Sequence, residues 1–146
     1  MTTTIQDHRG ALLAAATALA DACMSEYIRR TSGIELQAGE RYAGVLLHED
    51  GTPSHHVVLL PGAAEEVTWQ AAKDWAADAG GELPTRREQA LVFANAKTAF
   101  EEKWYWSGEE HEDGSYAWFQ SFSYGYQGSN HKSYEGRARA VRRVTA

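Results

Sequence analysis

The sequence predicts an α+β domain preceded by an N-terminal α-helix. Three observations indicate this class: a hairpin pattern in the first half, two helices with threonine caps after it, and a concentration of aromatic residues in the last third. At 146 residues, the chain has room for one domain and an appendage. We therefore expect residues 1–37 to form a helical segment and residues 38–146 to form the domain.

The first expected element is a helix over residues 10–30, which contain many alanines and no proline. Apolar residues recur there at a spacing of three or four, which places them on one helix face: Leu12, Ala16, Leu19, Cys23 and Tyr27. Gly33 is expected to end the helix. Because an alanine-rich stripe gives little stability alone, we expect it to pack on its own domain or on a second copy of the chain, with Cys23 as a buried thiol.

A β-hairpin is expected next. Residues 42–47 and 55–60 are apolar, and the Asp-Gly pair at 50–51 between them is a strong turn signal. In such a hairpin, His48 and His55 are expected to lie across from each other.

Two helices should follow the hairpin. Thr68 is expected to cap the first one, which glycines 80–81 end. One face of it is expected to carry Trp69, Ala72, Ala76 and Ala79. Thr85 and Glu88 have the spacing of a capping box, so the second helix is expected to begin there and to run to about residue 99.

Ten of the 16 aromatic residues lie between Trp104 and Tyr134. Trp104 and Trp106 are expected on one face of a short strand, because side chains alternate along a strand. We then expect an acidic loop over residues 109–115, a second strand region over 116–126 with Trp118 and Phe122 buried, a long loop over 125–136, and a final strand over 137–144 that carries four arginines.

The charge balance limits the partners. There are 14 Lys and Arg residues against 20 Asp and Glu residues, and the net charge of −6 argues against nucleic-acid binding. The longest apolar run, residues 10–20, is short for a membrane span, and no export signal pattern is present. One cysteine cannot form an internal disulfide. We therefore expect a cytoplasmic protein with no nucleic-acid or membrane partner.

Five motifs together indicate a family: TWQAA at 68–72, GELPTRRE at 81–88, WYWSGE at 104–109, YAWF at 116–119 and GRARAVRR at 136–143. The set resembles the DUF1566 family, which has a C-type-lectin-like fold also found in surface proteins of the Lcl type, and is similar to the short versions carried by prophages and tailed phages. The resemblance covers roughly residues 40–144 and leaves the N-terminal helix outside. It implies a rigid base with variable loops, used to bind proteins or sugars, and no assigned enzymatic activity.

Metal sites have little support in the sequence. The Glu-Pro-Asn and Trp-Asn-Asp motifs through which many C-type lectins bind calcium are absent, and the acidic loop is read first as a solvated loop. His55 and His56 are adjacent, so on a strand they point to opposite faces and cannot chelate one ion. We expect no metal and no cofactor.

Catalysis is not expected either. No Gly-x-Ser-x-Gly motif is present, and Cys23 has no basic neighbour to activate it on the predicted stripe. The formylglycine-generating relatives of the fold depend on a cysteine pair, which this chain lacks. The glycines at 125 and 128 are not followed by a helix pattern, so they do not form a phosphate-binding loop. We expect a protein that is not an enzyme.

Four arginines, at positions 137, 139, 142 and 143, stand near the C-terminus. Residues 99–115 carry six acidic side chains and one lysine. We expect the final strand to lie near the Trp104 strand, with its arginines paired to those acids or stacked on tryptophan. The alternative is an exposed basic patch.

The best functional candidates lie in the aromatic loops and in the acidic loop. Tyrosine gives contact area at a small entropy cost, and serine and asparagine give adaptable hydrogen bonds, as in recognition surfaces. The expected partner-binding residues are Tyr116, Tyr124, Tyr126, Gln127, Asn130, His131, Lys132, Tyr134, Glu109, Glu110, Glu112 and Asp113.

We therefore expect a non-enzymatic binding protein of the phage or prophage type, whose partner is a protein. One version is an intracellular inhibitor of a host protein, such as a component of antiviral defence, because an acidic protein can occupy a channel meant for phosphates. The alternatives are a virion or surface module that binds a receptor or glycan, and an oligomeric assembly protein joined through the N-terminal helix.

Overall fold

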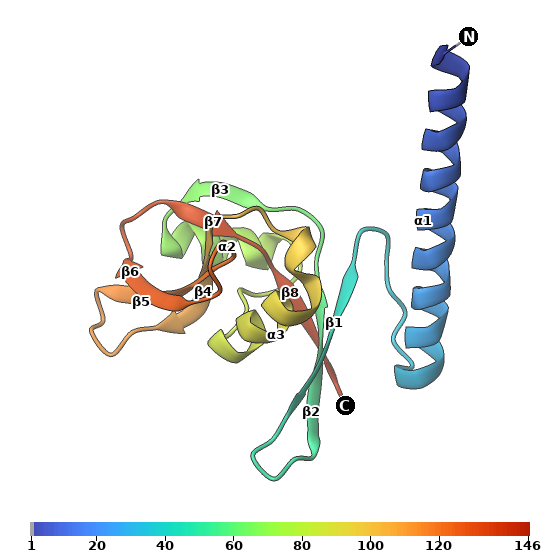
Figure 1. Cartoon of the computed structure of the whole chain (residues 1–146). Helices are drawn as coiled ribbons and strands as arrows, with labels where there is room; N and C mark the ends of the chain where they lie inside the picture. The colour runs from blue at the N-terminus through green and yellow to red at the C-terminus, as the bar shows by residue number, and fades with distance from the viewer. Residues whose placement is uncertain (1) are drawn as a thin grey trace. The chain divides into compact units, whose positions relative to one another are not determined.

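The computed structural model describes residues 2–146, with side chains from Ile5 onward. It is an α+β protein that divides into two compact units, Met1–Leu36 and Gln37–Ala146. The first unit contains the long helix α1 (Thr2–Ser32), and the second contains the remaining helices and all the described strands (Figure 1).

Helix α1 begins before the predicted start and ends as predicted. Gly33 has a φ of 73°, and its N–H donates to the Arg29 carbonyl at 2.9 Å, which closes the last turn. The predicted apolar stripe is exposed: Leu12 is 71 % and Leu19 is 66 % accessible, and Cys23 is exposed as well. The prediction of a buried thiol is therefore wrong, because the stripe has no covering surface within its own unit.

By length and composition alone, Ile5–Ser32 is long and apolar enough to cross a membrane, with a mean hydropathy of 1.3 over its most apolar 18 residues. The uninterrupted apolar run of residues 10–20 did not indicate this property, because the polar residues that interrupt the rest of the helix are few. A signal sequence or the core helix of a soluble protein meets the same criterion.

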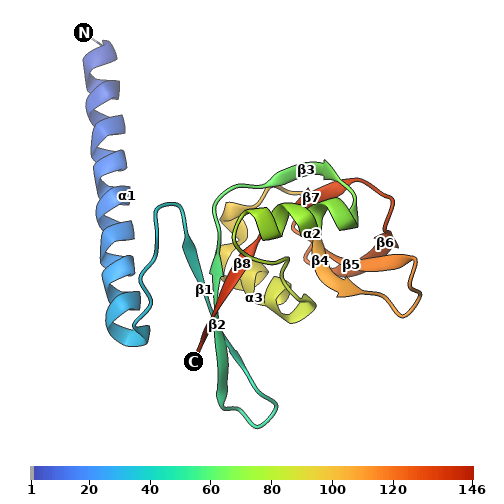
Figure 2. The ribbon, with the colours of Figure 1, turned by 180° about the vertical axis from the view of Figure 1, so that it is seen from behind.

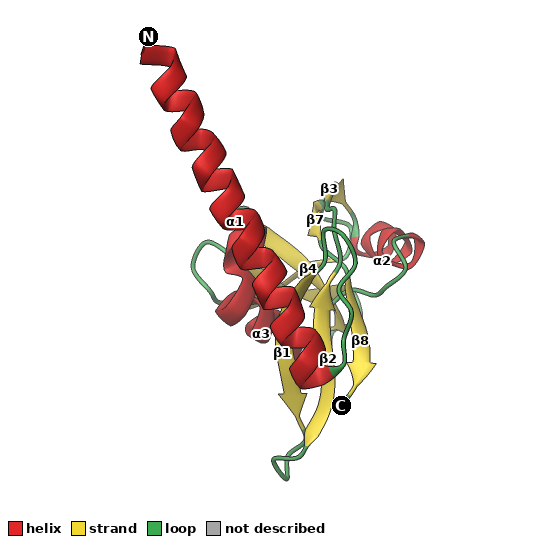
Figure 3. Ribbon diagram, turned by 90° about the vertical axis from the view of Figure 1, so that its right-hand side faces the viewer, coloured by secondary structure: helices red, strands yellow, loops and turns green. Residues whose placement is uncertain are grey.

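The second unit contains two sheets. The first has the strand order β1-β2-β8, from β1 (Arg41–Leu47), β2 (Pro53–Leu59) and β8 (Val141–Thr145), all antiparallel (Figure 3). The second has the order β3-β7-β4-β5-β6, from β3 (Ala64–Val67), β7 (Gly136–Ala138), β4 (Trp104–Glu110), β5 (Tyr116–Ser121) and β6 (Gln127–His131). The predicted hairpin is β1 and β2, but Leu46, not His48, lies opposite His55.

Helices α2 (Trp69–Asp78) and α3 (Arg86–Ala96) confirm the two predicted helices, but Ala79, predicted on the same face as Trp69, Ala72 and Ala76, is the residue after the end of α2 and is exposed. The Thr68 hydroxyl accepts the Ala71 N–H, and both hydrogen bonds of the predicted capping box between Thr85 and Glu88 are present. The second helix ends earlier than predicted, because its last residues tighten into a 3₁₀ turn, Lys97–Ala99.

Two predicted segments are wrong. The expected loop over residues 125–136 contains β6, since pairing with β5 imposes a strand on residues of low strand propensity. The expected final strand over 137–144 is two strands in different sheets: β7 pairs with β3 and with β4, and β8 pairs with β2. The sequence gives no sign of this switch, because both strands carry buried apolar residues and arginines. Strand β3 was not predicted from the sequence either.

Core clusters lie on both sides of the five-stranded sheet. Figure 2 shows the two helices, α2 and α3, on which these clusters pack. One side packs on α2 through a cluster that includes Trp69, Ala72, Ala76, Trp106, Ala117 and Phe119. The other side packs on α3 and on the three-stranded sheet through Ala43, Val57, Leu59, Val92, Ala96, Tyr105, Phe122 and Val141. Helix α3 is therefore held between the two sheets.

The C-terminal arginines pair inside the domain, as the first interpretation expected, but mostly with other acids. Arg137 binds Glu65 and Glu101, Arg142 binds Glu40, and Arg143 binds Glu82 and Glu88. Arg139 donates to the carbonyls of Leu60 and Ala99. Only Glu101 belongs to the acidic segment named from sequence, because β8 joins the other sheet and carries its arginines away from that segment.

Candidate functional site

The candidate site is the part of the five-stranded sheet that α3 leaves uncovered. Side chains alternate along β5, so Tyr116, Trp118 and Gln120 face one side, and Ala117 and Phe119 face the α2 core. Helix α3 covers this side only at one end, where Gln120 is 1 % exposed. At the other end, Tyr116 is 37 % exposed and Trp118 is half-buried.

A continuous series of rings lines this open end. The ring centroids of Trp118 and His111 are 4.9 Å apart, and those of His111 and Tyr116 are 6.4 Å apart. Tyr116 lies 5.5 Å from His131, which lies 6.4 Å from Tyr134. We call these five residues the ring face.

Arg86, at the first position of α3, closes one end of the ring face. Its guanidinium carbon lies 3.6 Å from the centre of a Trp118 ring, in cation–π geometry. Its Nε donates to Gln127 Oε1 at 3.0 Å, and Gln127 Nε2 donates back to the Arg86 carbonyl at 2.7 Å. This reciprocal pair fixes the start of the helix to β6. The prediction that Trp118 is buried in the core is wrong, since Arg86 covers only one side of its ring.

A cleft of about 450 Å³ lies beside the ring face, at the start of α3. It is lined by Arg86, Arg87, Ala90, Phe93, Glu109, Gln120, Gly125 and Gln127. Glu109 accepts the Arg86 backbone N–H at 2.5 Å, so a carboxylate satisfies one of the free donors of the helix start. The volume is in the range of small-molecule pockets.

The structure brings together only some of the predicted site residues. Tyr116, His131 and Tyr134 belong to the ring face, and Glu109 and Gln127 line the cleft. Lys132 forms an ion pair with Glu110, which lowers the pKa of that carboxyl through a charged hydrogen bond. Glu112 and Asp113 are exposed in the turn after β4.

The remaining predicted residues lie elsewhere. Tyr126 packs edge-on to Phe119, which belongs to the α2 side of the sheet, and Asn130 pairs across the strands with Ala117 on that side. Tyr124 is 86 % exposed in the turn between β5 and β6. Sequence reasoning missed Arg86, His111 and Trp118. The alternation of Tyr116 with Trp118 was the available signal for the tryptophan.

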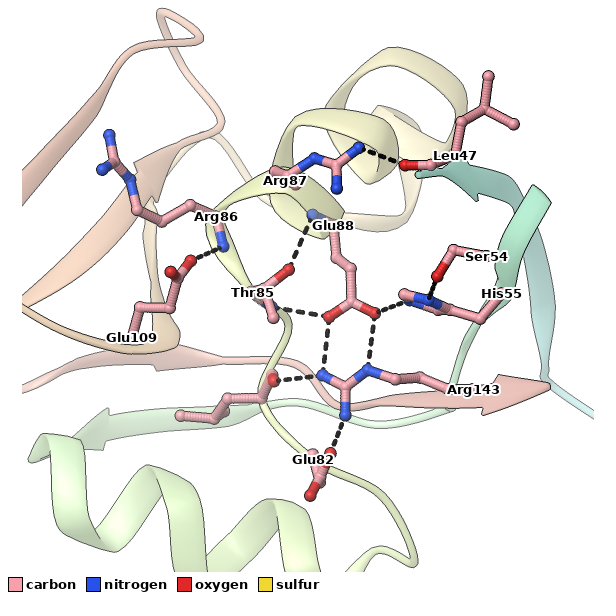
Figure 4. A network of polar contacts seen from close by, with 11 residues as sticks. Leu47, Ser54, His55, Glu82, Thr85, Arg86, Arg87, Glu88, Glu109 and Arg143 are labelled. Carbon is pink, nitrogen blue, oxygen red and sulfur yellow. Dashed lines mark hydrogen bonds and ion pairs between the residues drawn. The ribbon is translucent and has the colours of Figure 1, made fainter. Parts of the chain in front are cut away.

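A second polar cluster surrounds Glu88, which is fully buried (Figure 4). Its Oε1 accepts the Thr85 N–H at 2.8 Å and Arg143 Nη2 at 2.7 Å, and its Oε2 accepts Arg143 Nε at 2.7 Å. His55 Nε2 lies 2.9 Å from Oε2, and His55 Nδ1 lies 3.0 Å from Ser54 Oγ. The cluster joins β2, the start of α3 and β8.

The order Ser54, His55, Glu88 is the hydrogen-bonding order of a hydrolase triad. Here, however, Arg143 already binds both oxygens of Glu88 and balances its charge. In this cluster the carboxylate is thus held by an arginine as well as by the histidine. Burial also lowers the pKa of the Arg143 guanidinium, and the whole cluster acts as an anchor between three segments.

Among the described residues, no group of three or more His, Cys, Asp or Glu side chains could hold a metal ion. No protein-family model matches the sequence, and no curated protein is detectably similar to it. The ring face and its surroundings are therefore the candidate binding site of the domain.

Proposed function

We propose that this chain is a non-enzymatic binding module that recognises a protein partner through the ring face. The observation that carries the proposal is the series of five rings in mutual contact on a sheet face that no element of the domain covers at that end. Tyrosine and tryptophan are enriched among the few residues that carry most of the binding energy at protein interfaces. Tyr134, at 59 % exposure, contributes nothing to the core that would explain its presence.

Within this proposal, the domain is of the C-type-lectin-like type found in phage and prophage proteins. The hairpin β1–β2, the two helices α2 and α3 and the aromatic strands β4 and β5 that follow them support this assignment. The net charge of −6 favours a basic partner, and an intracellular host protein is the version we propose first.

The experiment that tests the proposal is co-purification with matched face variants. The tagged chain is expressed in a bacterial host, the partner is identified, and its affinity is measured for the wild type and for a Tyr116→Ser, Trp118→Ala double variant. The control is Tyr126→Ser, because Tyr126 is also exposed, at 56 %, but lies on the opposite side of the sheet.

We expect the double variant to lose the partner and the control to keep it. Equal binding by all three proteins would contradict the proposal. If no protein partner is found and the wild type binds a glycan array through the same residues, the ring face recognises sugar instead.

A second candidate role rests on α1. Its apolar side chains Ile5, Leu12, Leu19, Met24 and Tyr27 are all more than half exposed, and an apolar surface of this kind is typical of an interaction site. A Leu12→Glu, Leu19→Glu variant separates the roles: a fall in molecular mass indicates self-association, and loss of flotation with lipid vesicles indicates membrane attachment. An unchanged variant in both assays would exclude both roles.

A further inference from the structure

Strand β6 is an edge of the five-stranded sheet, with β5 on one side only. The register pairs Tyr116 with His131, Trp118 with Ser129 and Gln120 with Gln127. Two backbone hydrogen bonds show which residue pairs of β5 and β6 are hydrogen-bonded. The Ser121 N–H donates to the Tyr126 carbonyl at 2.8 Å, and the Lys132 N–H donates to the Ser115 carbonyl at 2.9 Å.

The alternation of bonded and non-bonded pairs decides where the backbone N–H and C=O groups of β6 point. In an antiparallel pair, hydrogen-bonded and non-bonded residue pairs alternate. Since residues 126 and 132 are in bonded pairs, Gly128 and Asn130 are too, and their N–H and C=O groups face β5. The backbone groups of Gln127, Ser129 and His131 therefore point outward, away from the sheet.

The edge lacks the usual protection against strand pairing. Exposed edges are normally blocked by proline, lysine, a bulge or a covering loop. β6 reads Gln-Gly-Ser-Asn-His, without a charge or a proline, and its pairing with β5 has no bulge. The next residue, Lys132, is engaged by Glu110. Nothing in the described side chains of β6 opposes the approach of another strand.

The outward backbone groups and the ring face lie together. The side chains of Ser129 and His131 are on the same side of the sheet as Trp118 and Tyr116, because they are their cross-strand partners. A strand added beside β6 would place every second side chain against this side.

We propose that β6 receives an extended segment of the partner protein as a sixth strand of the sheet. The backbone of Gln127 and Ser129 supplies the hydrogen bonds, and alternate apolar or aromatic side chains of the segment pack on Tyr116, His131 and Tyr134. The inference rests on the proposed function, since it names how the protein partner is bound.

A second copy of the chain fits this edge less well. Antiparallel pairing of two β6 strands about Ser129 would place Gln127 opposite His131. The His131 carbonyl already accepts the Tyr134 N–H at 2.9 Å, so at each end of such a pair the second strand would have to share that oxygen with Tyr134. A Gln–His contact also buries little apolar surface.

The test uses Ser129, whose N–H points outward. Ser129→Pro removes this donor but leaves the β5 ladder intact, because proline is tolerated where the N–H faces solvent. Ser129→Ala is the matched control, since it removes the hydroxyl and keeps the N–H. The probe is a displayed library of random peptides of about nine residues, long enough to span β6. Peptides selected on the full wild-type chain are measured by fluorescence anisotropy.

We expect selected peptides to alternate apolar residues and to bind Ser129→Ala as they bind the wild type. Ser129→Pro should weaken binding by at least about tenfold, the effect of losing a hydrogen bond and a close backbone approach. Equal affinity for the proline variant, or no peptide enriched over a blank support, would overturn the proposal. A wild-type dimer that Ser129→Pro converts to a monomer would assign the edge to a second copy instead.

The two proposals fail in different ways. If the co-purified partner is lost with Tyr116→Ser, Trp118→Ala but is bound equally by Ser129→Pro and Ser129→Ala, the ring face is the binding site and strand addition is wrong. If none of these substitutions affects the partner, both proposals fail. A circular dichroism spectrum and a urea midpoint matching the wild type establish that each variant is folded.

Discussion

The side of the five-stranded sheet that faces α3 has two halves with different surroundings. Under α3, Tyr105 and Phe122 are 2 % and 1 % exposed, and Phe122 stacks on Phe100 with ring centroids 3.9 Å apart. At the open end, Tyr116 and Trp118 touch His111 and Arg86, and solvent reaches them. Both halves are rich in aromatic rings, so the packing of α3, Phe100 and the three-stranded sheet decides which rings are buried in the core and which reach solvent.

The largest expected effect comes from the covered half. Phe122→Ala would leave a cavity among Phe93, Phe100 and Tyr105, which all contact its ring. We expect the free energy of unfolding to fall by about 4 kcal/mol, from lost burial and the cavity that remains. Urea denaturation measures it. A loss below about 1 kcal/mol would show that the covered half is not the core described here.

The anchor of α3 comes next. Glu88→Ala leaves the Arg143 guanidinium and His55 without their buried carboxylate. We expect a loss of about 3 kcal/mol, because the Thr85 N–H, His55 and two of the Arg143 guanidinium nitrogens lose their buried acceptor, while Arg143 Nη1 keeps its pairing with Glu82. Glu109→Ala is the control, since that exposed carboxylate also binds the start of α3 and should cost about 1 kcal/mol or less. Equal losses would mean that the helix is not held mainly by the buried cluster.

A smaller effect should appear as a pH dependence. The Arg142 guanidinium lowers the pKa of Glu40, whose side chain is 4 % exposed. The pair therefore stabilises the fold fully above the ordinary glutamate pKa of about 4.3, and the contribution is lost as the pH falls through the lowered pKa of the folded state.

Glu40→Gln tests this contribution. We expect it to cost about 2 kcal/mol at pH 7, from the lost charged hydrogen bonds, and to flatten the acid limb of the stability curve. The comparison is the unfolding free energy at pH 7 and at pH 3. A variant with the same acid limb as the wild type would show that other carboxyls govern acid unfolding.

The smallest stability effect is expected at the open end. Trp118→Ala removes a half-buried ring and its contact with Arg86, so we expect a loss of about 1 kcal/mol or less. The same substitution should abolish partner binding. If it instead destabilises the protein as strongly as Phe122→Ala, the open half is part of the core and the ring face is wrongly assigned.

Much of the fold was predictable from local patterns. The hairpin, both threonine caps and the buried face of α2 follow from turn signals and spacing over a few residues. Strand β6 did not follow, because Gly128, Ser129 and Asn130 have low strand propensity and become a strand only by pairing with β5. The split of the last segment between two sheets was equally hidden.

The candidate site was predictable in composition but not in arrangement. The sequence by itself determined that tyrosine, histidine and glutamine residues gather near the C-terminus, in a pattern that does not by itself place them in the core. Only the tertiary structure decided which of these side chains lie next to one another. It placed Tyr126 and Asn130 with the α2 side of the sheet and brought Arg86 and His111 to Trp118. The reason is physical: a local pattern fixes which way a side chain points from its own strand, whereas coverage of that side depends on where a distant helix packs.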